Sequence, residues 1–311
     1  MRGTEYASTF VVLCPTRAGK RRIGYFRLQS FRLEGEGSMK TYVACYNDSS
    51  EMTIEGERFL RPGFLDSFLG YLKDRNLDVK VFARHLERLL VELSGSGIDP
   101  SAVDAYFLDC SNLNEYQTLA RGVILKRLSL AGLSRCPAPT EKIRLSAKQY
   151  LRGVFVVNYF IAKALGDMMP KAEAIALFED FTDLQTKTKY NLPHLEKVAD
   201  LLAAKSPPGE VFAGGHDFVE FELNEGQAGC KVMKCKWHEV LKEFNDPDLE
   251  YAVICHYDFE AARCHNPNFK LTREGTLAQG RPYCDFIWHD TRVKKSLNHP
   301  AKDFWDNLTA K

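Results

Sequence analysis

The chain has 311 residues, of which 45% are hydrophobic and 27% are charged, a composition typical of a folded globular protein. Its 42 basic and 41 acidic residues give a formal net charge of +1, which provides no overall charge for binding nucleic acid or an anionic membrane surface. This length accommodates one large domain or two ordinary ones.

The beginning of the chain contains no export signal. Charged residues surround a short apolar stretch at 10–13, which is too short for the apolar core of a signal peptide. The longest apolar run, 154–162, is too short to span a bilayer and predicts a buried helix. We therefore predict a cytoplasmic protein with no membrane partner, in which the nine cysteines are reduced thiols.

The first part of the chain is expected to contain strands and then helices. Segments rich in β-branched and aromatic residues predict three strands: 9–13, 22–33 and 41–46. Segments with apolar residues at helical spacing predict two helices: 79–93 and 116–132. Asp99, followed by Pro100, is a predicted N-cap.

The segment Cys136-Pro137-Ala138-Pro139 is the predicted domain boundary, because two prolines interrupt regular structure and leave an extended connector. We expect residues 1–138 to form an N-terminal α+β region and residues 139–311 to form the second domain. The N-terminal region could cover a pocket, mediate homodimerisation or bind a partner, and the sequence does not distinguish among these roles.

The second domain is predicted to begin with helices at 140–205 and to continue with a sheet-containing part at 210–290. The expected helices are 140–165, one that opens at Pro170, 192–204 and 247–260. Apolar and acidic residues alternate over 219–223, which predicts a strand with one buried face, and further strands are expected through 231–233, 269–277 and 283–288. The fold class is therefore α+β: a β-rich and helical N-terminal region, then a helical block packed on a small antiparallel sheet.

The segment from Cys230 to His289 contains most of the reactive side chains. It holds five of the nine cysteines and four of the eight histidines, with acidic residues among them. Thiols and imidazoles beside carboxylates are what a thiolate nucleophile or a transition-metal site requires. Burial alone is the simplest explanation for any one of these thiols, since free cysteine is among the most buried residue types.

A nucleophile and a metal site would use these residues differently. Cys255 and Asp258 are three residues apart on the helix expected at 247–260, so they would share one face, and Arg273 or His256 could supply the cation that stabilises a thiolate. The spacing Cys230-x4-Cys235-x2-His238 is plausible for metal ligands but does not match a standard zinc finger.

Three motifs near the end of the chain resemble a known family. Ile254-Cys-His-Tyr-Asp258, Arg273-Glu-Gly-Thr-Leu-Ala-Gln-Gly280 and Cys284-Asp-Phe286 are similar to the closing signature of the L-2-amino-thiazoline-4-carboxylate hydrolase family. The resemblance covers roughly residues 140–290.

The ending Gly280-Arg-Pro-Tyr-Cys284 is also similar to the vinyl-reductase-like ligand-binding domain of aromatic-compound sensors. That likeness implies a zinc site of glutamate and cysteine ligands. Arg273 and Thr276 stand where the glutamate and one of the cysteines would fall. We therefore expect no metal and no cofactor, with zinc as the disfavoured alternative.

The hydrolase resemblance implies opening of a C–N bond in a small, cyclic, cysteine-derived substrate by cysteine and aspartate chemistry. It implies Cys255 or Cys284 as nucleophile, although an activated water is the alternative attacking group, and Asp258 or Asp285 as acid/base. Arg273 would bind the substrate carboxylate, with Thr276 and His256 as further substrate-binding residues. The alternative for Arg273 is a structural ion pair with Asp285. The alternative function is a non-catalytic small-molecule sensor that uses the same pocket.

Overall fold

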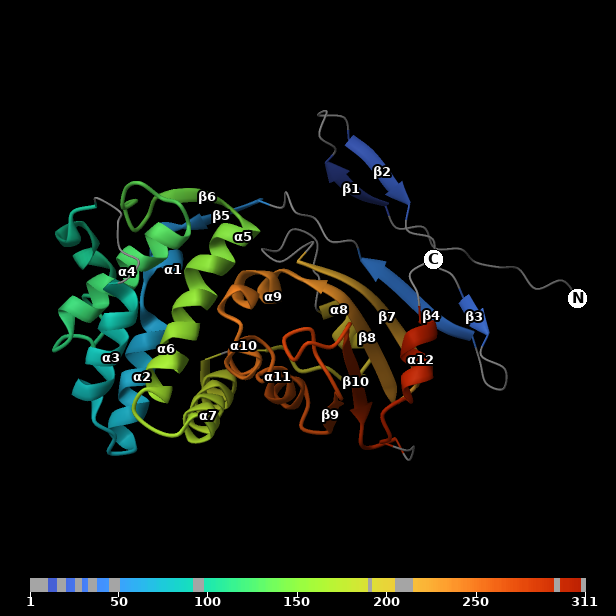
Figure 1. The fold of residues 1–311 in the computed structure, drawn as a ribbon. Coiled ribbons are helices and arrows are strands. Elements are labelled where there is room, and N and C mark those ends of the chain that lie inside the picture. Colours follow the sequence, from blue (N-terminus) through green and yellow to red (C-terminus); the bar gives the residue numbers. More distant parts are fainter. Residues whose placement is uncertain are drawn as a thin grey trace, which may run out of the picture.

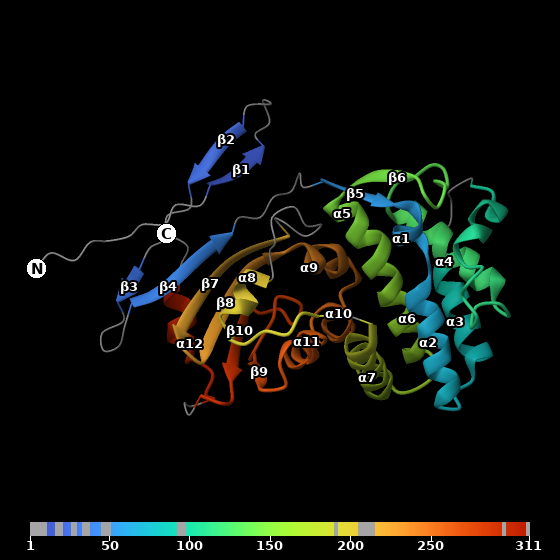
Figure 2. The same ribbon diagram turned by 180° about the vertical axis from the view of Figure 1, so that it is seen from behind.

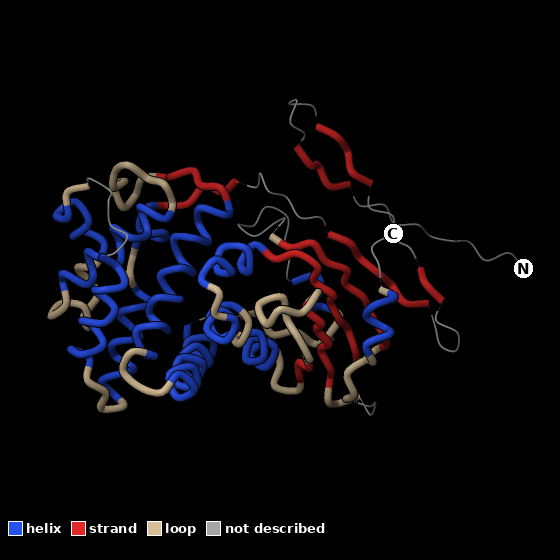
Figure 3. Tube along the Cα trace, in the orientation of Figure 1, coloured by secondary structure: helices blue, strands red, loops and turns tan. Residues whose placement is uncertain are grey.

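The structure is a computed structural model. It describes residues 11–15, 21–25, 30–32, 38–44, 51–91, 98–189, 192–204, 215–293 and 297–308. Figures 1 and 2 show a block of helices beside a twisted antiparallel sheet, with helices α9, α10 and α11 lying between them. The tube view in Figure 3 separates the mainly helical half from the half that carries the sheet.

The helical block is built from the middle of the chain around one large apolar core. Its helices are α1 (Gly56–Leu60), α2 (Gly63–Asp74), α3 (Val79–Val91), α4 (Gln117–Leu130), α5 (Ala147–Leu151), α6 (Val157–Gly166) and α7 (Lys171–Lys189), with a 3-10 helix at Pro100–Tyr106 and a π-helical segment at Arg152–Val156. Phe68, Phe82 and Phe181 are fully buried, and their rings pack edge to face around Phe68. A hairpin of β5 (Glu51–Glu55) and β6 (Lys142–Ser146) also belongs to this half.

The main sheet has six antiparallel strands in the order β3-β4-β7-β8-β10-β9. These strands are β3 (Ser30–Arg32), β4 (Ser38–Ala44), β7 (His216–Asn224), β8 (Gln227–Cys235), β9 (Phe269–Thr272) and β10 (Cys284–Asp290). Helices α9 (Lys236–Leu241), α10 (Pro247–Ile254) and α11 (Asp258–His265) are inserted between β8 and β9, and a 3-10 turn, Lys242–Phe244, follows α9. Strands β1 (Val11–Pro15) and β2 (Arg21–Tyr25) form a separate hairpin.

Each face of the sheet is covered by a different set of elements. Helix α8 (Asp200–Ala204) and α11 pack on the face that carries Cys284 and Phe286. Helix α12 (Lys302–Asn307) packs on the opposite face, where Trp305 contacts Phe221 and lies in one apolar cluster with Ile287. Because side chains alternate along a strand, β10 contributes to both layers.

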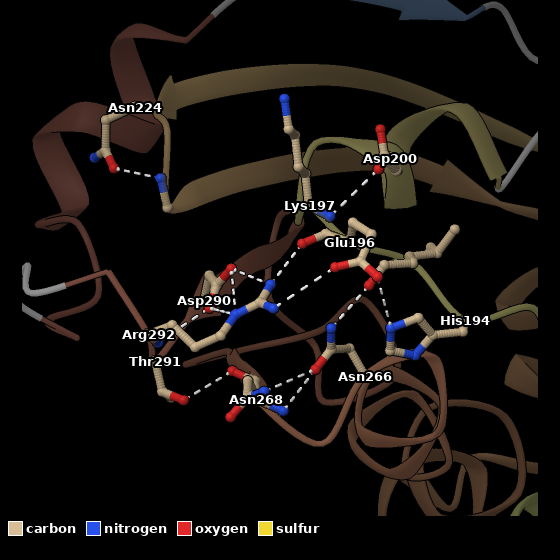
Figure 4. A network of polar contacts seen from close by, with 12 residues as sticks. His194, Glu196, Lys197, Asp200, Asn224, Asn266, Asn268, Asp290, Thr291 and Arg292 are labelled. Atoms are coloured by element: carbon tan, nitrogen blue, oxygen red, sulfur yellow. Dashed lines mark hydrogen bonds and ion pairs between the residues drawn. The ribbon is translucent and has the colours of Figure 1, made fainter.

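A polar network fixes the segment before α8 against the end of the sheet (Figure 4). Arg292 Nε donates to Asp290 Oδ1 at 2.9 Å, and the Arg292 guanidinium also reaches the backbone carbonyl of Glu196. Asn266 Nδ2 donates to the Leu195 carbonyl at 2.8 Å. These bonds hold the chain extended, which explains why the helix predicted at 192–204 is reduced to Asp200–Ala204.

The predicted α+β class is confirmed, as are the helices at 79–93 and 116–132 in their main parts. The caps were also predicted correctly: Asp99 Oδ1 accepts from Ser101 N, and Asp246 Oδ1 accepts from Leu249 N. The predicted strands at 9–13, 22–33 and 41–46 correspond in part to β1–β4 and lie in part outside the described residues. None of the described helices has the length and apolar character needed to cross a membrane.

Strand pairing crosses the predicted boundary at 138/139. Strand β4 pairs with β7, and β5 pairs with β6, so each pair joins a strand before residue 138 to one after it. The helix expected from Thr140 therefore begins only at Ala147. Ile143 and Leu145 are buried while Lys142 and Arg144 are exposed, which is the alternation of a half-buried strand.

Candidate functional site

A buried arginine is the centre of the candidate site. Arg273 follows β9, and its side chain is only 1% exposed. Its Nη1 donates to Asp258 Oδ2 at 2.8 Å, and its Nη2 donates to Tyr251 Oη at 3.1 Å and to the Cys255 carbonyl at 3.0 Å. Three aromatic rings surround the guanidinium carbon at 4.9–5.3 Å: Tyr251, Phe259 and Phe286. Burial alone would lower the pKa of Arg273, but the Asp258 carboxylate raises that pKa above its ordinary value.

The same arginine explains a correction to the predicted helices. The single helix expected at 247–260 is two helices, α10 and α11, separated at Cys255–Tyr257. The Cys255 carbonyl, at the C-cap of α10, accepts from Arg273 Nη2 at 3.0 Å and from Asp258 N at 3.3 Å, while Phe259 N, the donor that a continuous helix would use, donates to the His256 carbonyl. The spacing had predicted that Cys255 and Asp258 share one face of a single helix. This prediction is wrong, because Cys255 ends α10 and Asp258 begins α11.

Three thiols interact with one another: Cys235 at the end of β8, Cys255 at the end of α10 and Cys284 at the start of β10. Arg273 acts on the last two. Burial raises the pKa of Cys235 to about 12, that of Cys284 to about 11 and that of Cys255 well above its ordinary value. The Arg273 charge lowers the pKa values of Cys255 and Cys284, and Leu277 N donates to Cys284 Sγ at 3.2 Å, but burial is the larger effect. The three thiols are therefore protonated at neutral pH.

Asp285 lies apart from these thiols. It follows Cys284 on β10, so its side chain points to the opposite face of the sheet. Its Oδ1 accepts from the backbone N–H groups of Glu274 and Gly275, both at 2.9 Å. The ion pair that was the alternative for Arg273 is formed with Asp258 and not with Asp285.

The remaining predicted residues have well-defined partners. Thr276 is fully buried and its hydroxyl donates to Gln279 Oε1 at 3.0 Å, which shapes the turn after Arg273. His256 joins two acids of α7: its Nδ1 lies 3.3 Å from Glu179 and its Nε2 lies 3.3 Å from Asp183. Burial alone would lower the pKa of His256, but Glu179 and then Asp183 raise it.

A cavity of about 460 Å³ adjoins this site between α7 and α10. It is lined by Lys171, Ala172, Ile175, Glu179, Asp248, Tyr251 and Gln279. Tyr251 connects the cavity to Arg273, and Glu179 connects it to His256. The cavity is within the size range of small-molecule sites, and its wall carries both a cation and carboxylates.

Residues 155–288 match the family model of L-2-amino-thiazoline-4-carboxylic acid hydrolase. This match confirms the resemblance predicted from the motifs. We refer to residues 155–288 as the hydrolase-family segment; it contains Arg273, Asp258 and every residue that lines the cavity. It indicates a hydrolase-type function for this part of the chain. No curated protein and no solved structure matches the chain. The likeness to the vinyl-reductase-like domain stays a prediction.

Sequence analysis missed several residues of the hydrolase-family segment that line the cavity. Tyr251 lies four residues before Cys255 on α10, one helical turn away, so the motif around Cys255 could have indicated it. Gln279 lies within the family-like motif Arg273–Gly280, so that motif could have indicated it. Lys171 and Glu179 come from α7, and no local pattern marks them, because only the packing of α7 against α10 brings them to the cavity.

The metal-ligand spacing considered for this segment is not assembled as one group. His238 Nδ1 lies 2.5 Å from Glu250, and Cys230 is buried in the apolar cluster under α8. Among the described residues, one group of three possible metal ligands has its ligand atoms within 4.8 Å of one another: Glu274, Asp285 and His299, around the other face of β10.

Proposed function

We propose that this protein is a hydrolase that opens the ring of a small, cysteine-derived cyclic amino acid of the 2-amino-thiazoline-4-carboxylate type. The observation that carries the proposal is the cavity beside Tyr251, all of whose lining residues fall in the hydrolase-family segment. Its volume of about 460 Å³ suits a small zwitterion.

The charged groups of the cavity suggest how such a substrate binds. Lys171 Nζ lies 2.8 Å from Asp246 and 2.9 Å from Asp248, and its side chain is half exposed, so it can also reach a substrate carboxylate. Glu179, on the same wall, can accept from the amino group of the ring. Arg273 is 1% exposed and donates to Asp258, Tyr251 and the Cys255 carbonyl. We therefore assign it a positioning role, in which it holds Tyr251 at the cavity wall, in place of the carboxylate-binding role expected from the resemblance.

Water is the attacking group that the electrostatics favour. In the proposed step, a water oxygen bonds to the carbon between the ring nitrogen and the sulfur, and Glu179, held by His256, takes the water proton. The bond from that carbon to the ring nitrogen then breaks, and the nitrogen takes a proton to become the free amine of S-carbamoyl-cysteine. Water and substrate account for every atom of the product.

The cysteine and aspartate route remains the competing mechanism. It needs Cys255 or Cys284 as thiolate, with Asp258 or Asp285 as acid/base. A thiol with a pKa of about 11 is ionised in roughly one molecule in ten thousand at pH 7. Asp285 also points away from both thiols. These two facts favour water over a thiolate as the attacking group.

The test is direct turnover of L-2-amino-thiazoline-4-carboxylate by the full chain. Mass spectrometry should find a product heavier by one water, with a new primary amine and no new thiol. A new thiol would mean that the C–S bond breaks instead. Failure of the wild-type protein to convert this substrate or its close ring analogues would remove the hydrolase proposal.

Variants separate the two routes. We expect Glu179→Gln to lower kcat about 10²–10⁴-fold, as loss of a general base does. Cys255→Ser and Cys284→Ser should keep most of the activity, and Cys110→Ser, a buried thiol of the helical block, is the matched control. Iodoacetamide should label Cys255 and Cys284 more slowly than the partly exposed Cys264. Inactivation by either cysteine variant, with Cys110→Ser active, would favour the thiolate route.

A non-catalytic binding module is the second candidate, and one observation favours it: the thiols are buried and protonated, which a sensor tolerates. In that case calorimetry would detect binding of the same compound, and the mass of the compound would be unchanged after long incubation with the protein. Turnover by the wild-type chain that is lost in Glu179→Gln excludes this candidate.

A further inference from the structure

The face of β10 opposite the thiols carries a second group of polar side chains. Glu274, Asp285 and His299 each offer one ligand atom, and these three atoms lie within 4.8 Å of one another. We propose that they form a binding site for a divalent first-row transition-metal ion. This inference does not depend on the proposed hydrolase activity.

His299 is the observation that points to a ligand. Its side chain is only 7% exposed, and its Nε2 has no hydrogen-bond partner in the described part of the chain. Nε2 faces Asp285 Oδ2 at 3.5 Å, which is longer than a charged hydrogen bond between nitrogen and oxygen. A buried imidazole nitrogen aimed at a carboxylate beyond bonding distance needs an explanation, and a cation between the two atoms supplies one.

The geometry around Asp285 suits such an ion. Its Oδ1 is used by the N–H groups of Glu274 and Gly275, which leaves Oδ2 directed at His299. Bonds of about 2.1 Å to Oδ2 and Nε2, which lie 3.5 Å apart, give an angle of about 110° at the ion, close to tetrahedral. The exposed carboxylate of Glu274 would be the third protein ligand, and water would complete the coordination.

Neighbouring side chains orient His299 as a metal-binding imidazole requires. Its Nδ1 lies 3.1 Å from Thr272 Oγ1, and its ring stacks on Trp305 with ring centroids 5.3 Å apart. The Thr272 hydroxyl oxygen can accept from Nδ1–H, which leaves the Nε2 lone pair free for a metal. The same hydroxyl lies 2.8 Å from His289 Nε2, and burial lowers the pKa of His289 to about 4, so that second ring adds no charge.

The ligand set indicates the class of ion. One imidazole with two carboxylates suits Mn²⁺, Fe²⁺ or Zn²⁺ better than it suits Ca²⁺, which prefers an all-oxygen shell. The ion would tie the segment that contains His299 and α12 to β10. Lys231 Nζ already supports this attachment, since it donates to the Trp305 carbonyl and, at 2.8 Å, to the Leu308 carbonyl.

The experiment uses the full chain, stripped with EDTA and then titrated with Mn²⁺, which binds thiolates less well than Zn²⁺ does. Electron paramagnetic resonance measures free Mn²⁺, and tryptophan fluorescence reports on Trp305. We expect one Mn²⁺ per chain, quenching of the fluorescence and a higher Tm with the ion than without it.

Variants assign the site. Glu274→Gln should weaken Mn²⁺ binding at least tenfold, and His299→Gln should abolish it, whereas Asp303→Asn, on the exposed side of α12, should bind as the wild type does. Glu274 is exposed, so its variant should keep the metal-free Tm, which separates lost binding from lost folding. Absence of Mn²⁺ binding by the wild type, or binding that Glu274→Gln and His299→Gln leave unchanged, would overturn the proposal and leave His299 and Asp285 as an ion pair.

Discussion

The two halves of the molecule each bury an arginine, but with different partners. In the helical block, Arg127 Nη1 donates to the backbone carbonyls of Phe59, Leu60 and Arg61, at the end of α1. Burial lowers the pKa of Arg127 to about 10. In the sheet half, Arg273 pairs with a carboxylate, and its pKa is raised. Arg127 thus closes a helix end, whereas Arg273 is part of a charged pair that adjoins a cavity.

Burial of a charge therefore does not by itself mark a functional site. Arg127 donates to carbonyls that the end of a helix leaves without a partner. Asp258 neutralises Arg273, and Tyr251 connects that pair to the cavity wall. If the contrast is correct, removal of each guanidinium should have effects of different size and kind.

Substitution of Arg273 should have the largest effect. Arg273→Met leaves Asp258 without its counter-charge and removes one of the donors to the Cys255 carbonyl, so we expect the free energy of unfolding to fall by about 3–5 kcal/mol. Urea denaturation measures this loss, and turnover should be lost with it. Arg281→Met, an exposed residue of the same turn, is the control. A loss below about 1 kcal/mol would contradict the assignment of a buried charged pair.

Substitution of Arg127 should cost less. Arg127→Met removes the donor to three carbonyls but leaves no unpaired carboxylate, so we expect a loss of about 1–3 kcal/mol. Turnover per folded molecule should be unchanged, because Arg127 touches no residue of the cavity wall. If this variant lost more stability than Arg273→Met, the contrast between the two arginines would be wrong.

A double-mutant cycle measures the coupling between Asp258 and Arg273. Asp258→Asn combined with Arg273→Met should be less destabilising than the sum of the single changes, with a coupling of about 1–2 kcal/mol. The same cycle between Asp258 and Arg127, which lie in different halves, serves as the control and should give additive losses within error. Additivity in the Asp258–Arg273 cycle would mean that the two charges do not stabilise each other.

The smallest effect concerns pH and His256. Its folded-state pKa is raised above 6.5, so the stabilisation from Glu179 and Asp183 is fully present below pH 6.5 and is lost as the pH rises through the folded-state pKa. His256→Gln should therefore reduce the free energy of unfolding by about 1 kcal/mol at pH 6 and by less at pH 9. Denaturation of His85→Gln at the same two pH values is the comparison. An equal loss for His256→Gln at both pH values would show that its charge plays no part.

Local sequence patterns predicted the fold class and the family resemblance. Apolar spacing predicted α3 and α4, alternation predicted β7, and the caps at Asp99 and Asp246 followed from residue type alone. These features depend on neighbours within a few residues, so a pattern in the chain is enough to predict them. The motifs from Cys255 to Phe286 likewise identified the hydrolase-family segment that the match confirms.

The arrangement of the candidate site depends on tertiary packing. Arg273, which is 18 residues away, donates to the Cys255 carbonyl at the point where the helix expected at 247–260 divides into α10 and α11. The pKa values of the thiols depend on burial by distant elements, and Lys171 and Glu179 reach the cavity because α7 packs against α10. Periodicity predicts which face of a helix or strand is buried. The elements that cover that face, and the charges that they carry, come from residues far away in the sequence.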